Sequence, residues 1–412
     1  MDPLLARSPF TWDSDDEPTV RYVIIGNGFD LECGLYTSYR HFLDFIRNRG
    51  YTDQPSNTAR KHSFDYSDWE SLRKNNYWFR RFNSIQIGSG WIDFENEIAR
   101  VVTTIERSMV NSDGWHAFID DNVRWSPEHN NDYILTDIFD HLSVSGTAIQ
   151  TYRELVKKLL YDLESLTKAF EAYLYKTVHM SSMEETDATK GLVARIVTSN
   201  QAYVISFNYT KTLERLLINH TDCCEFCYVH GAIGDGKSKN QMVLGINEHQ
   251  GADSLESPIE FGPFRKYNQR IFKQTDSKYM DWIKKACEPY EISRQLKQLE
   301  DQTLTSSYDK QTIDRITNYT VSEREKQRQR MLPMEVIIFG HSLGITDEDI
   351  LKSFITLPNT RTLVYYHSEE AFSQQVSNIT AILGKEEVIA RTGGRDRTLE
   401  FRDQREPSSW SI

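Results

Sequence analysis

The chain has 412 residues, which is long enough for one large α/β domain with insertions or for two domains. Its net charge is −12, because 48 lysines and arginines face 60 aspartates and glutamates, and this excess of acid disfavours nucleic acid as a partner. No apolar run approaches the roughly 18 to 20 residues of a membrane helix, and five cysteines are too few for a disulfide framework. We therefore expect a cytoplasmic protein without a membrane partner.

The first predicted element is a buried strand that ends in a glycine-rich turn. The run "YVII" is apolar throughout and breaks into Gly26, Asn27 and Gly28, and residues 38–46 then carry apolar side chains at helical spacing. Glycines let a backbone approach a ligand closely, and amides beside a helix N-terminus favour an anion such as phosphate. The turn therefore predicts a cofactor-binding segment.

The same turn also has a purely structural interpretation. The dinucleotide fingerprint needs a third glycine at position 31, where this chain has Leu31. In the structural interpretation, Asn27 tolerates an unusual backbone angle in a tight connection and Asp30 caps the helix. Taken alone, the stretch leaves both interpretations open.

A long helical region is predicted after this strand. Residues 91–110 and 151–178 carry apolar side chains three and four positions apart. Helical geometry sends Asp93 and Glu97 to one face and Glu95 away from it. We expect a solvated helix face here rather than a metal or acid–base pair, although Glu95 could cover a crevice of the sheet.

Further buried strands are predicted in the rest of the chain. Near-continuous apolar runs, which are typical of parallel strands buried on both faces, begin at residues 202, 226, 334 and 362. Helical segments separate them, so the pattern predicts a doubly wound, Rossmann-like parallel α/β sheet with a large α-helical insertion. Ligands bind beyond the carboxyl ends of such strands, and the polar residues that follow each run should therefore share one crevice.

Two of these strand ends carry candidate catalytic residues. Asn208, in "SFNYT", offers a donor and an acceptor that could fix a ribose hydroxyl or hold a water for attack. His230, in "YVHGAIGD", could be a general base, because an unperturbed histidine has a pKa of about 6.5. Each could instead be an ordinary structural residue, but their joint occurrence favours function.

The loop "GHSLGITDED" follows the run that begins at residue 334. Ser342 could hydrogen-bond a nucleotide, whereas Asp347 is better explained as a helix N-cap, even if the loop lines a pocket. Cys223, Cys224 and Cys227 lie just before His230, but no second Cys or His pair follows at zinc-site spacing, so we expect no metal.

The pattern also suggests boundaries along the chain. The helical stretch over residues 278–331 is polar enough to be partly exposed to solvent. The expected parts are a disordered acidic leader (1–20), the start of a nucleotide-binding α/β domain (21–84), a helical insertion (85–200), the continued α/β domain (201–277), a helical excursion (278–331) and the C-terminal part of the α/β domain (332–412).

These motifs, in this order, resemble the AbiH family of phage abortive-infection proteins. The matching segments lie between residues 22 and about 352 and are "IIGNGFDLECGLYTSYRHFLDFI", "WIDFE", "ISFNYTKTLE", "VHGAIGD", "VLGINE" and "IIFGHSLGITDEDI". The resemblance implies an anti-phage effector. A phage-derived trigger and a homo-oligomer are compatible with such a role.

The layout is also similar to sirtuin-like NAD-binding domains. Carried over by position, the similarity implies a pyrophosphate site at Gly26, Asn27 and Gly28, with Asp30 beside it, a ribose- and water-orienting Asn208, a general base His230, and an adenosine loop with Ser342 and Asp347. Two departures are the Gly-Asn-Gly turn in place of Gly-Ala-Gly and Thr210 in place of an Asp.

This similarity implies NAD as a substrate, hydrolysed to nicotinamide and ADP-ribose. ADP-ribosyl transfer shares the same ribose chemistry and remains open. The alternatives from other classes are a nucleotide-sensing or partner-binding defence module without turnover, and a toxin directed at nucleic acid.

Overall fold

A computed structural model describes residues 19–48, 66–85, 93–109, 133–144, 151–234, 241–246, 259–394 and 397–410. Most of the predicted acidic leader, up to residue 18, lies outside this part of the chain. In the described residues, no helix combines the length and the apolar composition that crossing a membrane requires.

Six parallel strands form a sheet in the order β3-β2-β1-β4-β5-β6. The strands are β1 (Val20–Ile25), β2 (Gln201–Ser206), β3 (Cys224–Tyr228), β4 (Met334–Phe339), β5 (Thr360–Tyr366) and β6 (Leu399–Asp403). The strand order reverses between β1 and β4, so the chain winds outward from the centre in both directions. The predicted doubly wound parallel sheet is confirmed, and β6 is a strand that the sequence pattern did not predict.

The apolar runs form strands because both faces of the sheet are covered. Along β1, Tyr22 and Ile24 belong to the core on one face, and Val23 and Ile25 belong to the core on the other. The helices α14 (Glu348–Ile355), α15 (Glu369–Leu383) and α16 (Lys385–Thr392) cover the first face, and α1 (Asn27–Glu32), α9 (Asp187–Val197) and α10 (Thr212–Leu216) cover the second. Burial on both faces explains why these strands lack polar alternation.

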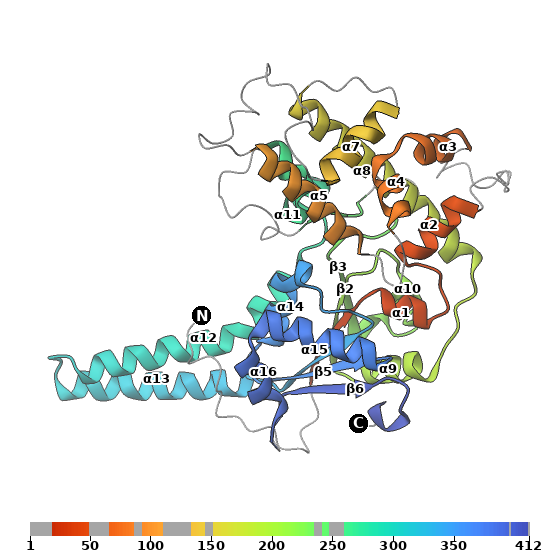
Figure 1. The fold of residues 1–412 in the computed structure, drawn as a ribbon. Coiled ribbons are helices and arrows are strands. Elements are labelled where there is room, and N and C mark those ends of the chain that lie inside the picture. Colours follow the sequence, from red (N-terminus) through yellow and green to blue (C-terminus); the bar gives the residue numbers. More distant parts are fainter. Residues whose placement is uncertain are drawn as a thin grey trace.

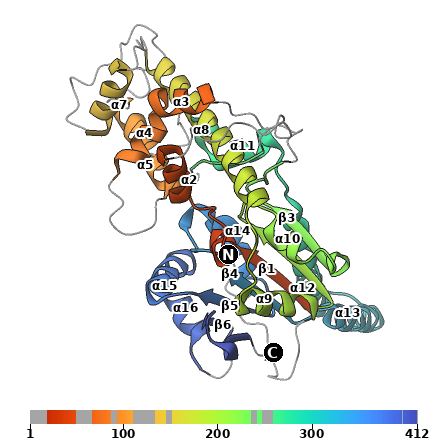
Figure 2. The same cartoon turned by 90° about the vertical axis from the view of Figure 1, so that its right-hand side faces the viewer.

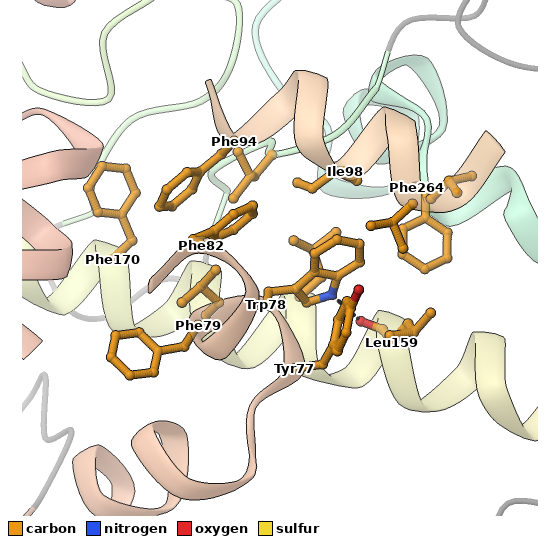
Figure 3. Close-up of a cluster of buried hydrophobic side chains, with 14 of the residues drawn as sticks. Tyr77, Trp78, Phe79, Phe82, Phe94, Ile98, Leu159, Phe170 and Phe264 are labelled. Atoms are coloured by element: carbon orange, nitrogen blue, oxygen red, sulfur yellow. Dashed lines mark hydrogen bonds between the residues drawn. The ribbon is translucent and has the colours of Figure 1, made fainter. Parts of the chain in front are cut away.

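A separate helical core lies beyond the carboxyl edge of the sheet (Figures 1 and 2). We call it the helical cap; it consists of α2 (Tyr39–Asn48), α3 (Tyr66–Asn75), α4 (Tyr77–Ser84), α5 (Phe94–Met109), α7 (Tyr133–Val144) and α8 (Tyr152–Met180). Figure 3 shows its aromatic centre, where Phe82 stacks on Phe94 with ring centroids 3.9 Å apart and the Trp78 indole donates to the Leu159 carbonyl over 2.8 Å. The helices predicted over 38–46, 91–110 and 151–178 are confirmed as α2, α5 and α8.

A helical hairpin projects from the side of the sheet (Figure 1). It consists of α12 (Lys278–Leu304) and α13 (Lys310–Arg330), and it follows η4 (Ile259–Phe264) and α11 (Lys266–Lys273) in the chain. Trp282 joins its base to the sheet by packing on Tyr203, with ring centroids 4.8 Å apart.

Candidate functional site

A hollow lies where the carboxyl edge of the sheet meets the helical cap. It holds about 860 Å³ of empty space, part of it open to solvent, and its lining comes from the ends of β1 to β4 and from α2, α5 and α8. Seven of the eight predicted site residues line it: Gly26, Asn27, Asp30, Asn208, His230, Ser342 and Asp347. Because the strand order reverses between β1 and β4, this is the position at which open α/β sheets bind ligands.

The eighth residue, Gly28, serves a packing role. Its backbone N–H donates to the Gly340 carbonyl over 2.8 Å, so this amide is not available to a phosphate. A Cβ on Gly28 would lie 2.7 Å from Gly340 Cα, and one on Gly26 would lie 2.6 Å from Gly340 O. The two glycines are therefore needed for close contact with the backbone of Gly340, which agrees with a structural role of the turn but was not predicted.

Other details of that interpretation were wrong. A short helix, α1, begins directly at Asn27, which does not have a positive φ. The Asn27 side-chain oxygen accepts a hydrogen bond from the Thr37 hydroxyl over 2.7 Å. Asp30 lies inside α1 and does not cap it.

Asp30 and Asn208 are buried polar residues with unpaired atoms. The Thr210 hydroxyl donates to Asp30 Oδ2 over 2.6 Å, but Oδ1 makes no hydrogen bond of normal geometry within the described residues. The same holds for both Oδ1 and Nδ2 of Asn208, a residue that is 4% exposed. The Asn208 amide nevertheless lowers the pKa of the Asp30 carboxyl through a hydrogen bond, so the two side chains lie against each other where both line the hollow.

The Asp30 carboxyl binds its proton more tightly than an exposed aspartate does. Burial raises its pKa from 3.8 to about 6, and the hydroxyls of Thr210 and Thr212 and the amide of Asn208 oppose part of this rise. Because the folded state binds this proton more tightly than the unfolded state does, the carboxyl lowers the free energy of unfolding as pH rises from about 4 to above 6.

Asp30→Asn should remove this pH-dependent loss. We expect the variant to gain stability relative to the wild type as pH rises from about 4 to 8, by up to about 3 kcal/mol, since each pKa unit corresponds to about 1.4 kcal/mol. Urea denaturation at several pH values measures it, with the exposed Asp314→Asn on α13 as a control that should show no such trend. A stability difference independent of pH would contradict the account of Asp30.

A buried ion cluster joins the helical cap to the sheet. The Lys266 ammonium, from α11, lies 2.7 Å from Glu95 Oε2 of α5 and 2.8 Å from Asp347 Oδ1 of the loop after β4. Burial raises the pKa of Glu95 to about 7 despite the attraction of Lys266. For Asp347, burial alone would raise the pKa, but Lys266 and His230 outweigh it and hold the pKa well below its usual range.

This cluster corrects two expectations. Asp347 occupies the N-cap position of α14 but makes no capping hydrogen bond, because its carboxylate is committed to the ion cluster. The predicted solvated face of α5 was also wrong. Asp93 accepts a hydrogen bond from the Asn96 backbone N–H, Glu97 forms a buried ion pair with Arg81, and Glu95 lines the hollow.

His230 lies between the carboxylate of Asp347 and the guanidinium of Arg270. Its Nε2 is 3.1 Å from Asp347 Oδ1 and 3.2 Å from a guanidinium nitrogen of Arg270. Burial and the charge of Lys266 lower its pKa to about 4, so the ring is neutral at pH 7. When the proton is on Nε2, that nitrogen donates to Asp347 and the lone pair is on Nδ1; when it is on Nδ1, Nε2 accepts from Arg270.

A second histidine, His341, shares the same carboxylate. The Leu343 backbone N–H donates to its Nδ1 over 2.9 Å, so a neutral ring carries its proton on Nε2. That Nε2 lies 3.7 Å from Asp347 Oδ2. The Phe207 ring packs against both imidazoles, with ring centroids 5.3 Å from His230 and 4.4 Å from His341. Asp347 is therefore the centre of a cluster built from several separate segments.

Sequence reasoning missed Lys266 and Arg270. Both lie on α11, near the end of the segment predicted as the continued α/β domain (201–277) and just before the predicted helical excursion (278–331). No local sequence motif around them indicates a functional role. In the described residues, no group of three or more His, Cys, Asp or Glu side chains is placed to hold a metal ion. All five cysteines are free thiols, and Cys227 is buried in β3.

The family "Bacteriophage abortive infection AbiH" matches residues 22–367, a range that includes every residue lining the hollow. No curated protein matches the sequence.

Proposed function

Because the chain belongs to the AbiH family of bacteriophage abortive-infection proteins, we propose that it is an effector that binds NAD⁺ in the hollow and hydrolyses the bond between nicotinamide and ribose. The observation that carries the proposal is the buried amide of Asn208, which lines the hollow at the ligand-binding edge of a doubly wound sheet. Such an amide can donate to one ribose or water oxygen and accept from another hydroxyl. The similarity of the motifs to sirtuin-like NAD-binding domains supports the same substrate.

The charge of the hollow supports a cationic reaction centre. Asp30, Glu95 and Asp347 all line it, and Lys266 neutralises only part of their charge. As nicotinamide departs, the ribose becomes oxocarbenium-like and gains positive charge. Carboxylates in a buried site would stabilise this charge more strongly than water does.

The chain's residues can take the following parts in the reaction. The bond between C1′ and the pyridinium nitrogen breaks, and its electron pair neutralises nicotinamide. A water oxygen, oriented by Asn208, bonds to C1′ and gives its proton to Nδ1 of His230. Asp347, 3.1 Å from the opposite nitrogen, would stabilise the imidazolium that forms.

One observation favours a second candidate, a nucleotide-sensing module without turnover. With a pKa of about 4, His230 is a weak base in the hollow as described. A phage-derived trigger or a homo-oligomer could change its surroundings and raise that pKa. In the second candidate, NAD⁺ or ADP-ribose would bind and raise the melting temperature without being consumed.

Variants of the two proposed catalytic residues test the function. We expect Asn208→Ala and His230→Ala to lower NAD⁺ turnover by about 100-fold or more, the usual contribution of a positioned acid–base group. Nicotinamide and ADP-ribose are measured by chromatography. The matched controls are Asn318→Ala and His367→Ala, both exposed, which should turn over NAD⁺ like the wild type. Near-normal turnover in both site variants would overturn the assignment.

A further inference from the structure

We propose that the outer edge of β6 is an interface between two copies of this chain, which pair their β6 strands antiparallel and join their sheets into one. The inference goes beyond the proposed NAD⁺ chemistry and does not depend on it, because no residue of β5 or β6 lines the hollow that would hold the nucleotide. It rests on the backbone, the charges and the aromatic side chains of β6.

The backbone of β6 presents unpaired groups at this edge. β6 is the last strand of the sheet and pairs only with β5 in the described part of the chain. The Thr362 backbone N–H donates to the Thr398 carbonyl, so the backbone groups of even-numbered residues in this segment face β5. Those of Leu399, Phe401 and Asp403 therefore face away from the sheet. Within the described residues, the outward N–H and C=O groups of Leu399 and Phe401 have no hydrogen-bond partner.

An open groove lies along this edge. It holds about 890 Å³ of empty space, part of it open to solvent, and all five residues of β6 line it. The helical hairpin joins the sheet at the opposite edge, where Trp282 contacts Tyr203 of β2 and Glu225 of β3 (Figure 2). The helical cap lies beyond the carboxyl ends of the strands, and antiparallel pairing would place the two caps at opposite ends of the joined sheet. A second strand can therefore approach β6 without meeting either structure.

The charges of β6 match those of an antiparallel copy in one register. A two-fold axis beside the edge makes the two strands antiparallel, and outward-facing residues then lie opposite outward-facing residues. The registers with the greatest overlap centre on Glu400, Phe401 or Arg402. The first places Glu400 opposite its own copy and the last does the same for Arg402, whereas the register centred on Phe401 places Glu400 opposite Arg402 on both sides of the axis. Opposite charges stabilise a strand pair and like charges destabilise it, so the register centred on Phe401 is favoured.

The other face of the same edge is apolar. Phe401 packs edge-on against Phe372 of α15, with ring centroids 5.4 Å apart, and Phe372 is 39% exposed. In the register centred on Phe401, the two Phe401 rings lie opposite each other and their residues exchange both backbone hydrogen bonds. Aromatic pairs across strands are stabilising. An edge built only to prevent association would carry charges that repel a copy of itself, and β6 instead pairs acid with base.

Sedimentation velocity of the full chain over a range of concentrations tests this interface. The wild type should form a dimer, and Arg402→Glu, which places acid opposite acid on both sides of the axis, should raise the Kd of the dimer about 10-fold or more. Glu400→Arg should raise it likewise. An equimolar mixture of the two variants should dimerise again, because each mixed pair places acid opposite base. The exposed Arg315→Glu on α13 is the matched control and should dimerise like the wild type.

Hydrogen exchange of the wild type provides a second measurement that needs no folded variant. The Phe401 amide should become protected as the dimer forms, because it is then hydrogen-bonded to the other copy. A monomer at every concentration would overturn the proposal, in favour of an extended segment of another protein at this edge. A dimer that forms without protection of Phe401, or that both charge variants leave intact, would overturn it as well. NAD⁺ turnover enters neither readout, so failure of this interface is distinguishable from failure of the proposed function.

Discussion

Replacing Lys266 with methionine should lower the free energy of unfolding by about 3–5 kcal/mol at pH 8, the usual cost of breaking a buried ion pair. Methionine keeps most of the volume of the lysine side chain but leaves Glu95 and Asp347 without the cation that lies 2.7 and 2.8 Å from them. Two buried carboxylates would then repel each other across the junction between the helical cap and the sheet. Urea denaturation measures the loss, and the exposed Lys297→Met is the matched control.

The loss of stability in Lys266→Met should depend on pH. Glu95 already has a pKa raised to about 7, and removing Lys266 would raise it further. A carboxyl whose folded pKa is raised destabilises the fold progressively as pH rises from its unfolded pKa through the folded one, and this effect is lost again as pH falls. The deficit of Lys266→Met should therefore shrink towards pH 5, and Glu95→Gln in the same chain should restore part of the stability at pH 8. A loss below about 1 kcal/mol that is independent of pH would contradict the ion cluster as described.

Gly340→Ala should also be strongly destabilising, by about 3 kcal/mol or more. Gly340 has a φ of 66°, and a Cβ there would lie 2.3 Å from the backbone nitrogen of Phe29 and 2.6 Å from the carbonyl carbon of Gly28. Backbone atoms cannot rotate away as a flexible side chain can, so the loop after β4 would have to separate from the glycine turn. That separation would also distort the hollow, because Gly26 and Gly340 both line it.

Gly384→Ala is the control for this variant. Gly384 has a φ of 88°, but a Cβ there would meet no atom within 4 Å. With a ψ of 149°, it should lose only the roughly 1–3 kcal/mol that this positive-φ, extended conformation costs a residue with a side chain. Thermal and urea unfolding of both variants separate backbone strain from steric clash. Equal losses in the two variants would contradict the close contact of the two loops.

The fold could be predicted to a large extent because its strands are buried on both faces. Near-continuous apolar runs such as Met334–Phe339, which only Glu335 interrupts, are typical of a parallel α/β sheet. The order of the strands in the sheet could not be predicted in this way. It depends on which helix packs on which face, and no single segment of the sequence contains that information. Asn208 and His230 could be found because each directly follows a strand, and strand ends meet at one edge.

The electrostatics of the site could not be read from the sequence in the same way. Lys266 reaches Glu95 and Asp347 only because the fold brings α11 against both α5 and the loop after β4. Glu95 lines the hollow, as its alternative role of covering a crevice predicted, but its cation could not be predicted from the sequence. The pKa of His230 illustrates the same limit. An isolated histidine would titrate near 6.5, whereas burial and Lys266 lower this one to about 4.

The most direct test of the account is whether the wild-type chain converts NAD⁺. Protein purified from uninfected and from phage-infected cells is incubated with NAD⁺, and nicotinamide and ADP-ribose are followed by chromatography while the melting temperature is measured with each nucleotide. The account predicts equal amounts of the two products from at least one preparation. A raised melting temperature without products from either preparation would contradict hydrolysis and favour a nucleotide sensor, and the lack of both products and stabilisation would contradict nucleotide binding in the hollow.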